Sequence, residues 1–403
     1  MYSDQQVLDA YKANQYNQRA TARALGMART TLQDRLAKIG ERPEGVTDMP
    51  QIMVMKDRVR RLEEELREFQ REALDAHYVK SKILRLKEQV DGLPPPRWLE
   101  PPAPRRGVSQ SVPTLMLSDL HWGETVDRNQ MGGVNEYNLA IARKRLDSVI
   151  SKSISLLRNS IAGEEYPGFV LALAGDLLSG DIHEELRETN EGTAITALLD
   201  LLSALVAQIT LLANEFGKVY VPCVAGNHGR TTVKPRTKAR AETNMDWLLY
   251  QFLALHFQND PRVVIDAPVT PELTYRVFNH TYHLCHGDQL GKGGDGIIGA
   301  FGPIIRGDQR RRSLQAQLGS PYDTLLHGHY HTYAATRRFI SNGSLVGYSG
   351  YALSLGCSFE IPQQAFWLTH PEHGITFSMP VHAERPVVAG ADTSRWLTFE
   401  GAA

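Results

Sequence analysis

The stretch Val112-Pro113-Thr114-Leu115-Met116-Leu117-Ser118-Asp119-Leu120-His121 places an apolar run directly before an aspartate and a histidine two residues apart. Such a run predicts a buried strand, with Asp119 and His121 at its carboxyl end. Carboxylate and imidazole groups are common metal ligands. The triplet alone decides little, because a capping aspartate beside a loop histidine has the same spelling.

The pattern returns four more times along the chain, each time after an apolar run. The later clusters are Gly175-Asp176, Gly226-Asn227-His228, His286-Gly287-Asp288 and His327-Gly328-His329-Tyr330-His331. Ligands of α/β sheets gather outside the carboxyl ends of the strands. The five clusters together therefore predict one site at the edge of a sheet.

The rest of the chain from residue 111 onward alternates strand-like and helical stretches, which predicts an α/β fold. We expect helices over 138–160, 193–216 and 242–257. We expect strands over 169–174, 219–225, 282–285, 324–326, 337–340, 345–348, 365–368 and 375–377.

The ordered motifs D-x-H, G-D, G-N-H, H and G-H-x-H resemble the calcineurin-like metallophosphoesterase superfamily, over residues 114–331. The resemblance implies an αββα sandwich in residues 111–403 and two metal ions bridged by one carboxylate. It implies a first metal held by Asp119, His121, Asp176 and His331. It implies a second metal held by Asp176, Asn227, His286 and His329.

The residue types agree with a dinuclear hydrolytic centre. Asp176 has two oxygens and is suited to bridge two ions. Imidazole, carboxylate and amide ligands without thiolate favour Mn²⁺, with Fe, Zn²⁺ or Ni²⁺ as alternatives. Such a pair makes hydroxide available from a bridging water near neutral pH and clamps phosphate oxygens, which is the chemistry of a phosphoric ester hydrolase.

His228 follows a predicted ligand, and the resemblance makes it a general acid at the leaving-group oxygen. The superfamily usually has an acidic residue next, which helps to orient this histidine, but here Gly229 follows. Asp181 and Glu185 are two candidates for the orienting carboxylate, and His228 could also only pack. His183 lies in the loop after Asp176 and could contact a scissile phosphate, or be an ordinary surface histidine.

Two basic stretches flank the clusters and favour an extended polyanionic substrate, although solvated charge runs are the alternative. The first holds Arg230, Lys234, Arg236, Lys238 and Arg240, and the second holds Arg306, Arg310, Arg311 and Arg312. The glycine-rich residues 291–302 lack the spacing of a phosphate-binding P-loop, and a lid or a loop near the metals is the preferred interpretation.

Residues 1–45 predict three short helices in helix-turn-helix spacing, over 4–13, 17–25 and 28–39. Asn17 caps the second helix and Gly26 supplies the turn. Residues 20–32 resemble the Fis-type helix-turn-helix of bacterial regulators. The resemblance implies DNA binding, and a small bundle for protein contacts is the alternative. The predicted DNA contacts are Arg29, Thr30, Thr31, Gln33 and Arg35.

Residues 51–91 carry an apolar seam in steps of three and four, which predicts a coiled coil and a homodimer. A single long helix packed on its own domain is the alternative. Residues 92–110 are rich in proline and predict a semi-stiff linker. This combination of parts also resembles phage and prophage proteins.

The composition adds bounds. Lys+Arg number 44 and Asp+Glu 45, so any polyanion signal must be local. Three separated cysteines, a polar N-terminus and the absence of a recognised membrane-spanning stretch predict a cytoplasmic protein without membrane contact. We expect a DNA phosphodiesterase or nuclease. The alternatives are a phosphomonoesterase on nucleotides or phosphoproteins, and a DNA-binding regulator with a ligand-sensing metal site.

Overall fold

The computed structural model describes residues 2–39, 109–161, 164–182, 184–291, 301–354 and 359–384. The predicted coiled coil at 51–91, most of the linker at 92–110, His183 and most of the glycine-rich loop lie outside the described residues. The chain divides into two compact units, residues 1–82 and 83–403, and each is treated by itself.

The N-terminal unit contains the three helices that the sequence predicts, α1 (Asp4–Ala13), α2 (Gln18–Ala24) and α3 (Arg29–Ile39). Asn17 caps α2 as predicted, because its side chain accepts the amide N–H groups of residues 19 and 20. A small core joins the helices, made of Val7, Tyr11, Ala22, Leu32 and Leu36.

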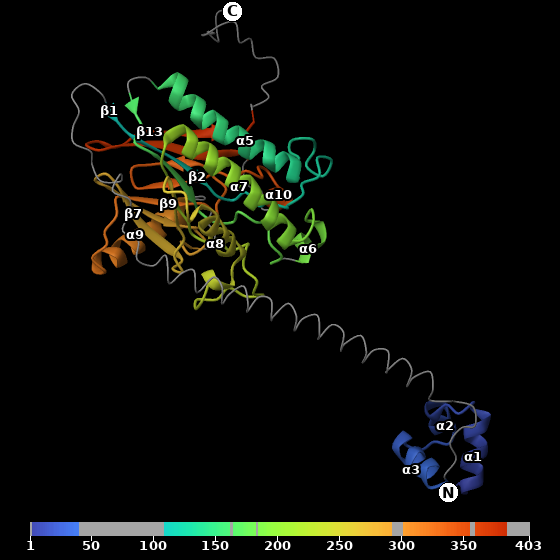
Figure 1. The fold of residues 1–403 in the computed structure, drawn as a ribbon. Helices are drawn as coiled ribbons and strands as arrows, with labels where there is room; N and C mark the ends of the chain where they lie inside the picture. Colours follow the sequence, from blue (N-terminus) through green and yellow to red (C-terminus); the bar gives the residue numbers. More distant parts are fainter. Residues whose placement is uncertain are drawn as a thin grey trace, which may run out of the picture. The chain divides into compact units, whose positions relative to one another are not determined.

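Two sheets build the large unit (Figure 1). The first has the order β13 (Gly374–His382), β12 (Gln363–His370), β2 (Val112–Leu117), β4 (Phe169–Leu173), β5 (Val219–Pro222), β6 (Val263–Asp266). Strands β2, β4, β5 and β6 are parallel, whereas β12 and β13 run antiparallel beside them. The parallel strands therefore end at one common edge.

The second sheet has the order β10 (Ala334–Ala335), β11 (Phe339–Ser341), β9 (Thr324–His327), β8 (His280–Cys285), β7 (Glu272–Val277). Strands β8, β9 and β11 are parallel. Strand β7 forms an antiparallel hairpin with β8. A short pair, β1 (Ser109–Gln110) with β3 (Glu164–Glu165), lies outside both sheets.

The helical segments of this unit are α5 (Leu139–Ser155) with a π-helical extension at Leu156–Ser160, α6 (Glu184–Thr189), α7 (Ala194–Phe216), a 3₁₀ turn at Ala241–Thr243, α8 (Met245–Phe257), α9 (Phe301–Gln317) and α10 (Gly350–Ser354). Four of these helices, α5, α7, α8 and α9, pack on the outer faces of the sheets, and the other helical segments are short. Figure 1 shows α5 and α7 side by side over the first sheet.

The alternation of side chains along β2 explains the layers. Leu115 and Leu117 face a core shared with α5, α7 and α8, whereas Met116 faces the second sheet. The outer face of the second sheet packs on α9 through Ile304 and Leu325. Both faces of β2 are covered, which is why its sequence is a continuous apolar run. The predicted four-layer αββα arrangement is confirmed.

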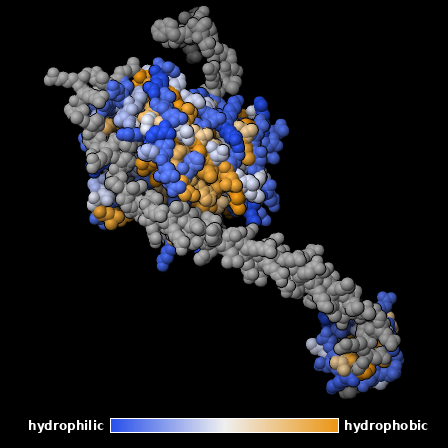
Figure 2. All heavy atoms as spheres, in the orientation of Figure 1, coloured by the Kyte–Doolittle hydropathy of each residue, from blue (hydrophilic) through white to orange (hydrophobic). Residues whose placement is uncertain are grey.

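Helix α7 corrects the expectation that the sequence has no stretch apolar enough to span a membrane. By length and composition Ala194–Phe216 is apolar enough to cross a bilayer. One face of α7 is buried in the core, through residues such as Leu201 and Leu205, whereas Ile195 (63% exposed) and Leu199 (55%) reach the surface. Figure 2 shows apolar surface on this side of the molecule.

One predicted strand is wrong. Residues 345–348 are irregular, and only Leu345 and Val346 among them are buried. The amide N–H of Leu345 donates to the carbonyl of Asp119 (3.1 Å) rather than to a neighbouring strand. Gly347 has φ +75°, which a regular strand does not allow. This segment therefore supports the loop that carries the first predicted ligands.

Candidate metal centre

The seven predicted metal ligands lie together at the carboxyl ends of the parallel strands. They come from the loops after β2, β4, β5, β8 and β9, and they are Asp119, His121, Asp176, Asn227, His286, His329 and His331. The five motifs, each in the loop after a strand, thus meet at one place, as the sequence predicted.

Left-handed backbone aims most of these side chains. Nine described non-glycine residues have positive φ, and five of them are predicted ligands: Asp119 (53°), His121 (45°), Asp176 (49°), His329 (70°) and His331 (54°). Such conformations cost roughly 1–3 kcal/mol each and concentrate at functional sites. More than half of these strained residues therefore lie in the turns that carry the predicted ligands.

The first group contains Asp119, His121 and His331. Nε2 of His331 lies 3.3 Å from Oδ1 of Asp119 and 3.2 Å from Nε2 of His121. The amide N–H of His329 donates to both carboxylate oxygens of Asp119 (3.0 Å each) and fixes that side chain. Two imidazole nitrogens and a carboxylate oxygen consequently converge on one point.

The second group contains Asp176, His286 and His329, with Asn227 beside it. Nε2 of His286 lies 3.0 Å from Oδ2 of Asp176 and 3.1 Å from Oδ1 of Asn227. Nδ1 of His286 lies 2.8 Å from the carbonyl oxygen of Ala174. A carbonyl only accepts, so Nδ1 carries a proton, and Nε2 is the ring nitrogen directed at the two oxygens.

The carboxylate of Asp176 and the amide oxygen of Asn227 both face the ring of His286. Burial lowers the pKa of His286, but the charge of Asp176 and the hydrogen bond to it outweigh burial and raise the pKa to about 10. The cavity thus favours positive charge even at a buried imidazole. The donor set fits divalent ions of the Mn²⁺ to Zn²⁺ series.

His228 lies between the two groups. Its ring is 4.4 Å from that of His121, and its amide N–H donates to Oδ1 of Asp176 (2.7 Å). Nδ1 of His228 lies 3.0 Å from the carbonyl oxygen of Ser179, which orients the ring. Burial lowers its pKa, and Asp176 opposes this effect.

The orienting group of His228 is therefore a backbone carbonyl, and neither predicted carboxylate takes that role. Asp181 and Glu185 are exposed. Sequence reasoning missed Ser179, because the atom that acts is common to every residue type. His183 lies outside the described residues, and its predicted role stays a prediction.

Gly229 has no room for the side chain that the sequence comparison expected. A Cβ there would lie 2.6 Å from Oδ1 of Asn244 and 3.2 Å from Cγ of Asp246. Gly180, with φ +68°, is equally restricted, because its Cβ would lie 2.0 Å from the carbonyl oxygen of His228. Both glycines allow close approach of the loops around His228.

Buried polar side chains that the sequence did not predict support Asp119 from behind. The hydroxyl of Ser118 donates to Asp119, and Nδ2 of Asn342 donates to that hydroxyl (2.9 Å). Oε1 of Gln364 accepts the amide N–H of Ser118 (2.9 Å). These partners are more than 200 residues from Ser118, so no local pattern could have identified them.

Glu124 is a further acidic group next to the centre. Its Oε2 lies 3.4 Å from Nδ1 of His121, and burial raises its pKa to about 7. The sequence reasoning did not single it out, although it follows His121 by only three residues. It adjoins His121 without a hydrogen bond, since Nδ1 of His121 is buried and has no hydrogen-bond partner among the described residues.

The basic stretches divide into two kinds. Arg240 forms a bidentate pair with Asp288 (2.8 Å), and three arginines of α9 are also engaged. Arg310 donates to the carbonyl of Leu290, Arg311 pairs with Glu272, and Arg312 pairs with Asp308. These arginines hold structure together. Lys234, Arg236 and Lys238 are exposed.

The predicted DNA-contacting residues also differ among themselves. Arg29, Thr30, Thr31 and Gln33 are exposed at the start of α3. Arg35 pairs with Asp4 of α1 and donates to the carbonyl of Tyr2 (2.9 Å), so it ties two helices of the unit together.

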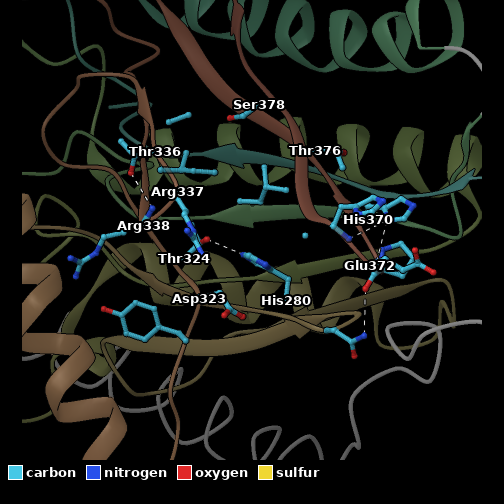
Figure 3. Close-up of a pocket in the computed structure, with 18 of the residues that line it drawn as sticks. His280, Asp323, Thr324, Thr336, Arg337, Arg338, His370, Glu372, Thr376 and Ser378 are labelled. Atoms are coloured by element: carbon cyan, nitrogen blue, oxygen red, sulfur yellow. Dashed lines mark hydrogen bonds between the residues drawn. The ribbon is translucent and has the colours of Figure 1, made fainter.

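A cavity of about 900 Å³ lies near the opposite ends of β8 and β9 (Figure 3). Figure 3 shows His280 directed at Thr324, and their Nε2 and Oγ1 atoms are 2.9 Å apart. Arg338 pairs with Asp308 (2.8 Å), and Nδ1 of His370 accepts two backbone N–H groups. These named lining groups pair with one another or with nearby backbone.

Comparisons with known proteins give no family. No family model matches the chain, and no curated protein matches it. Three similar solved structures are a vacuolar protein sorting 29 protein from Cryptosporidium parvum (12% identity, 64% of this chain and 86% of that chain, TM-score 0.27), a dimetal phosphatase from Danio rerio (10%, 68% and 99%, 0.31) and a sulfate thiohydrolase SoxB from Thermus thermophilus (12%, 70% and 58%, 0.28). At these TM-scores the likeness to the solved structures supports no conclusion about function. The function is therefore inferred from the residues of this chain.

Proposed function

We propose that the chain is a dinuclear-metal-dependent phosphoester hydrolase of the calcineurin-like metallophosphoesterase superfamily. One observation carries the proposal: Nε2 of His286 faces Oδ2 of Asp176 at 3.0 Å and Oδ1 of Asn227 at 3.1 Å, while Nδ1 is held by a carbonyl. A second group, built from Asp119, His121 and His331, adjoins it.

Asp119, His121 and His331 would hold one ion, Asn227, His286 and His329 the other, and Asp176 would bridge them. When bound, the ions supply Lewis acidity at the phosphate oxygens and make water acidic enough to yield a nucleophile at neutral pH. Mn²⁺ is the preferred ion of the proposal.

His228 is the proposed proton donor to the leaving group. Nδ1 of its ring faces the Ser179 carbonyl (3.0 Å), so Nε2 is the atom that takes up a proton and passes it to the departing oxygen. The hydrogen bond from the backbone N–H of His228 to Oδ1 of Asp176 (2.7 Å) keeps the ring next to the ligands. The chain thus places one titrating nitrogen beside the proposed reaction centre.

We further propose a phosphodiester substrate, most simply DNA. Lys234, Arg236 and Lys238 are exposed in the segment that follows His228, and Arg29, Thr30 and Thr31 are exposed on α3. A backbone phosphate track and a helix-turn-helix would use such groups. Dimerisation through 51–91 would pair two N-terminal units. A phosphomonoesterase on nucleotides or phosphoproteins is the alternative.

The test is a substrate panel on the full chain with Mn²⁺. We expect cleavage of a nitrophenyl phosphodiester and of DNA, and loss of both in chelator. Cleavage of a phosphomonoester only would overturn the nuclease proposal while keeping the hydrolase. No hydrolysis of any phosphoester, with metal bound, would favour the ligand-sensing regulator.

A charge-reversed variant tests the DNA part separately. Lys234, Arg236 and Lys238 changed together to Glu should weaken DNA cleavage and flatten its salt dependence, because fewer counterions are released on binding. Hydrolysis of the small diester should stay unchanged. Equal effects on both substrates would contradict a role in DNA binding.

A further inference from the structure

Asp246 is a buried carboxylate that no predicted role uses. It lies in the first turn of α8 and is fully buried. Its Oδ2 accepts the amide N–H of Asp176 (2.9 Å) and of Gly226 (3.0 Å), and its Oδ1 accepts that of Leu178 (3.3 Å). One side chain therefore holds the backbone of two ligand-bearing loops.

The turn before α8 strengthens this connection. Nδ2 of Asn244 donates to the carbonyl of Gly226 (2.8 Å), and the amide N–H of Met245 donates to the carbonyl of Gly229 (2.7 Å). The loop from Gly226 to Gly229 carries Asn227 and His228, so both are fixed from each end by residues 244–246.

Helix capping does not account for the carboxylate of Asp246. Oδ1 of Asn244 already accepts the amide N–H of Asp246 (2.8 Å) and caps α8. Burying a carboxylate beside the carboxylate of Asp176 is unfavourable, and three amide donors only partly offset it. The position is thus costly unless the geometry of the two loops requires it.

Gly229 leaves the space that Asp246 fills. A Cβ at position 229 would lie 3.2 Å from Cγ of Asp246. The acidic group expected directly after His228 is absent from the sequence, and a carboxylate from α8 lies in its place. Through Leu178 it also holds the strand of backbone that leads to Ser179, the residue that orients His228.

We propose that Asp246 is a positioning residue of the metal centre, which sets Asp176, Asn227 and His228 in register by holding the backbone of both loops. The inference rests on the proposed function. It adds a residue that contacts no substrate and acts only through the ligands and His228.

The test compares Asp246→Asn with Asp266→Asn in the full chain. Asn keeps the shape of Asp but turns an NH₂ group toward amide donors. Asp266 is a matched control, because among the described residues its side chain accepts the hydroxyl of Tyr220 (2.6 Å) and bonds to neither ligand-bearing loop. Three readouts apply: Mn²⁺ affinity by calorimetry, the paramagnetic resonance signature of a paired Mn²⁺ site, and kcat and KM on a small diester.

We expect Asp246→Asn to weaken Mn²⁺ binding by roughly 10–100-fold, as loss of a group that orients ligands does, and to lower kcat more than it raises KM. The signal of coupled Mn²⁺ ions should weaken or vanish. Asp266→Asn should retain wild-type values. Wild-type affinity, spectrum and kcat in Asp246→Asn would overturn the inference.

The metal-free protein shows whether each variant folds, independently of its function. If Asp246→Asn does not fold, Gly229→Ala carries the test, since its Cβ displaces the same turn while the carboxylate remains. We expect the same loss of Mn²⁺ affinity, and unchanged affinity overturns the inference. If wild-type protein binds no Mn²⁺ and hydrolyses nothing, the proposed function itself fails, which is a different result.

Discussion

The two ends of strands β8 and β9 both carry histidines, and they differ in what those histidines face. At the carboxyl end, Nε2 of His286 faces oxygens of Asp176 and Asn227 within a candidate metal site. At the amino end, His280 is paired with Thr324 (2.9 Å) beside a cavity of about 900 Å³. β8 has six residues, so the ends are roughly 20 Å apart.

The difference shows which features indicate a ligand. Histidines and open volume are present at the amino end as well. The carboxyl end instead combines buried carboxylates and imidazoles that converge with backbone at positive φ, as at Asp176 (49°) and His329 (70°). Convergence of buried ligand atoms and backbone strain, rather than the volume of a cavity, identify the candidate centre.

The largest expected effect comes from removing the proposed bridge. Asp176→Asn should lower kcat on a diester substrate by roughly a hundredfold or more, beyond what loss of a supporting group costs, because an amide cannot bridge two cations with two anionic oxygens. The matched change at the other end is Asp323→Asn, where Oδ2 only accepts the amide N–H of Thr281 (2.8 Å). Its kcat should not change. Comparable losses in both variants would erase the contrast between the two ends.

Metal-dependent stability should separate the histidines next. Ligand at about a hundred times its Kd stabilises a protein by about 2.7 kcal/mol per site, so Mn²⁺ should raise the Tm of wild-type protein clearly. His286→Ala should lose at least half of that rise, whereas His280→Ala should keep it. Differential scanning calorimetry with and without chelator measures both. Equal shifts in the two variants would mean that Mn²⁺ binds elsewhere.

Backbone strain gives a smaller and more local comparison. Gly180 and Gly319 have similar φ values, +68° and +73°, but a Cβ would meet the His228 carbonyl at 2.0 Å in the first and nothing within 4 Å in the second. Gly319→Ala should cost about 1 kcal/mol from the left-handed conformation alone. Gly180→Ala should cost more than about 3 kcal/mol, because clash adds to strain. Urea unfolding at fixed metal concentration gives both values, and similar costs would mean that the loop around His228 yields easily.

The sequence could predict that the five polar clusters meet at one edge, because each follows its strand directly, whereas the four-layer αββα fold is what the family resemblance implies. Apolar runs in the sequence indicate the strands, and each predicted ligand follows its strand within a few residues, as Asp119 follows β2. The supporting groups depend on contacts between distant segments. Asn342 and Asp246 reach the site only after the layers pack.

Two other misreadings have physical causes. The orienting atom of His228 is the backbone carbonyl of Ser179, which no residue type marks. The arginines of α9 looked like a phosphate track, but Arg311 pairs with Glu272 of β7 and fastens the helix to the sheet. Charge in a sequence shows the sign of a side chain, whereas its partner depends on the fold.

The smallest expected effect tests the amino end directly. Arg337 and His373 line the cavity, Arg337 is exposed and is labelled in Figure 3, and the rings of His370 and His373 stack at 4.6 Å. Changing both Arg337 and His373 to Ala should alter stability by no more than about 0.5 kcal/mol, as for other surface changes, and should leave kcat and KM on a small diester unchanged. The same holds for short DNA if the substrate stays near the ligands. A rise in KM for long DNA alone would show that the polymer extends to this end, and the two ends would then differ in chemistry but share a substrate. A fall in kcat on the small diester would instead mean that the cavity influences catalysis. Because the cavity lies roughly 20 Å from the candidate centre, that influence would have to pass through the strands β8 and β9.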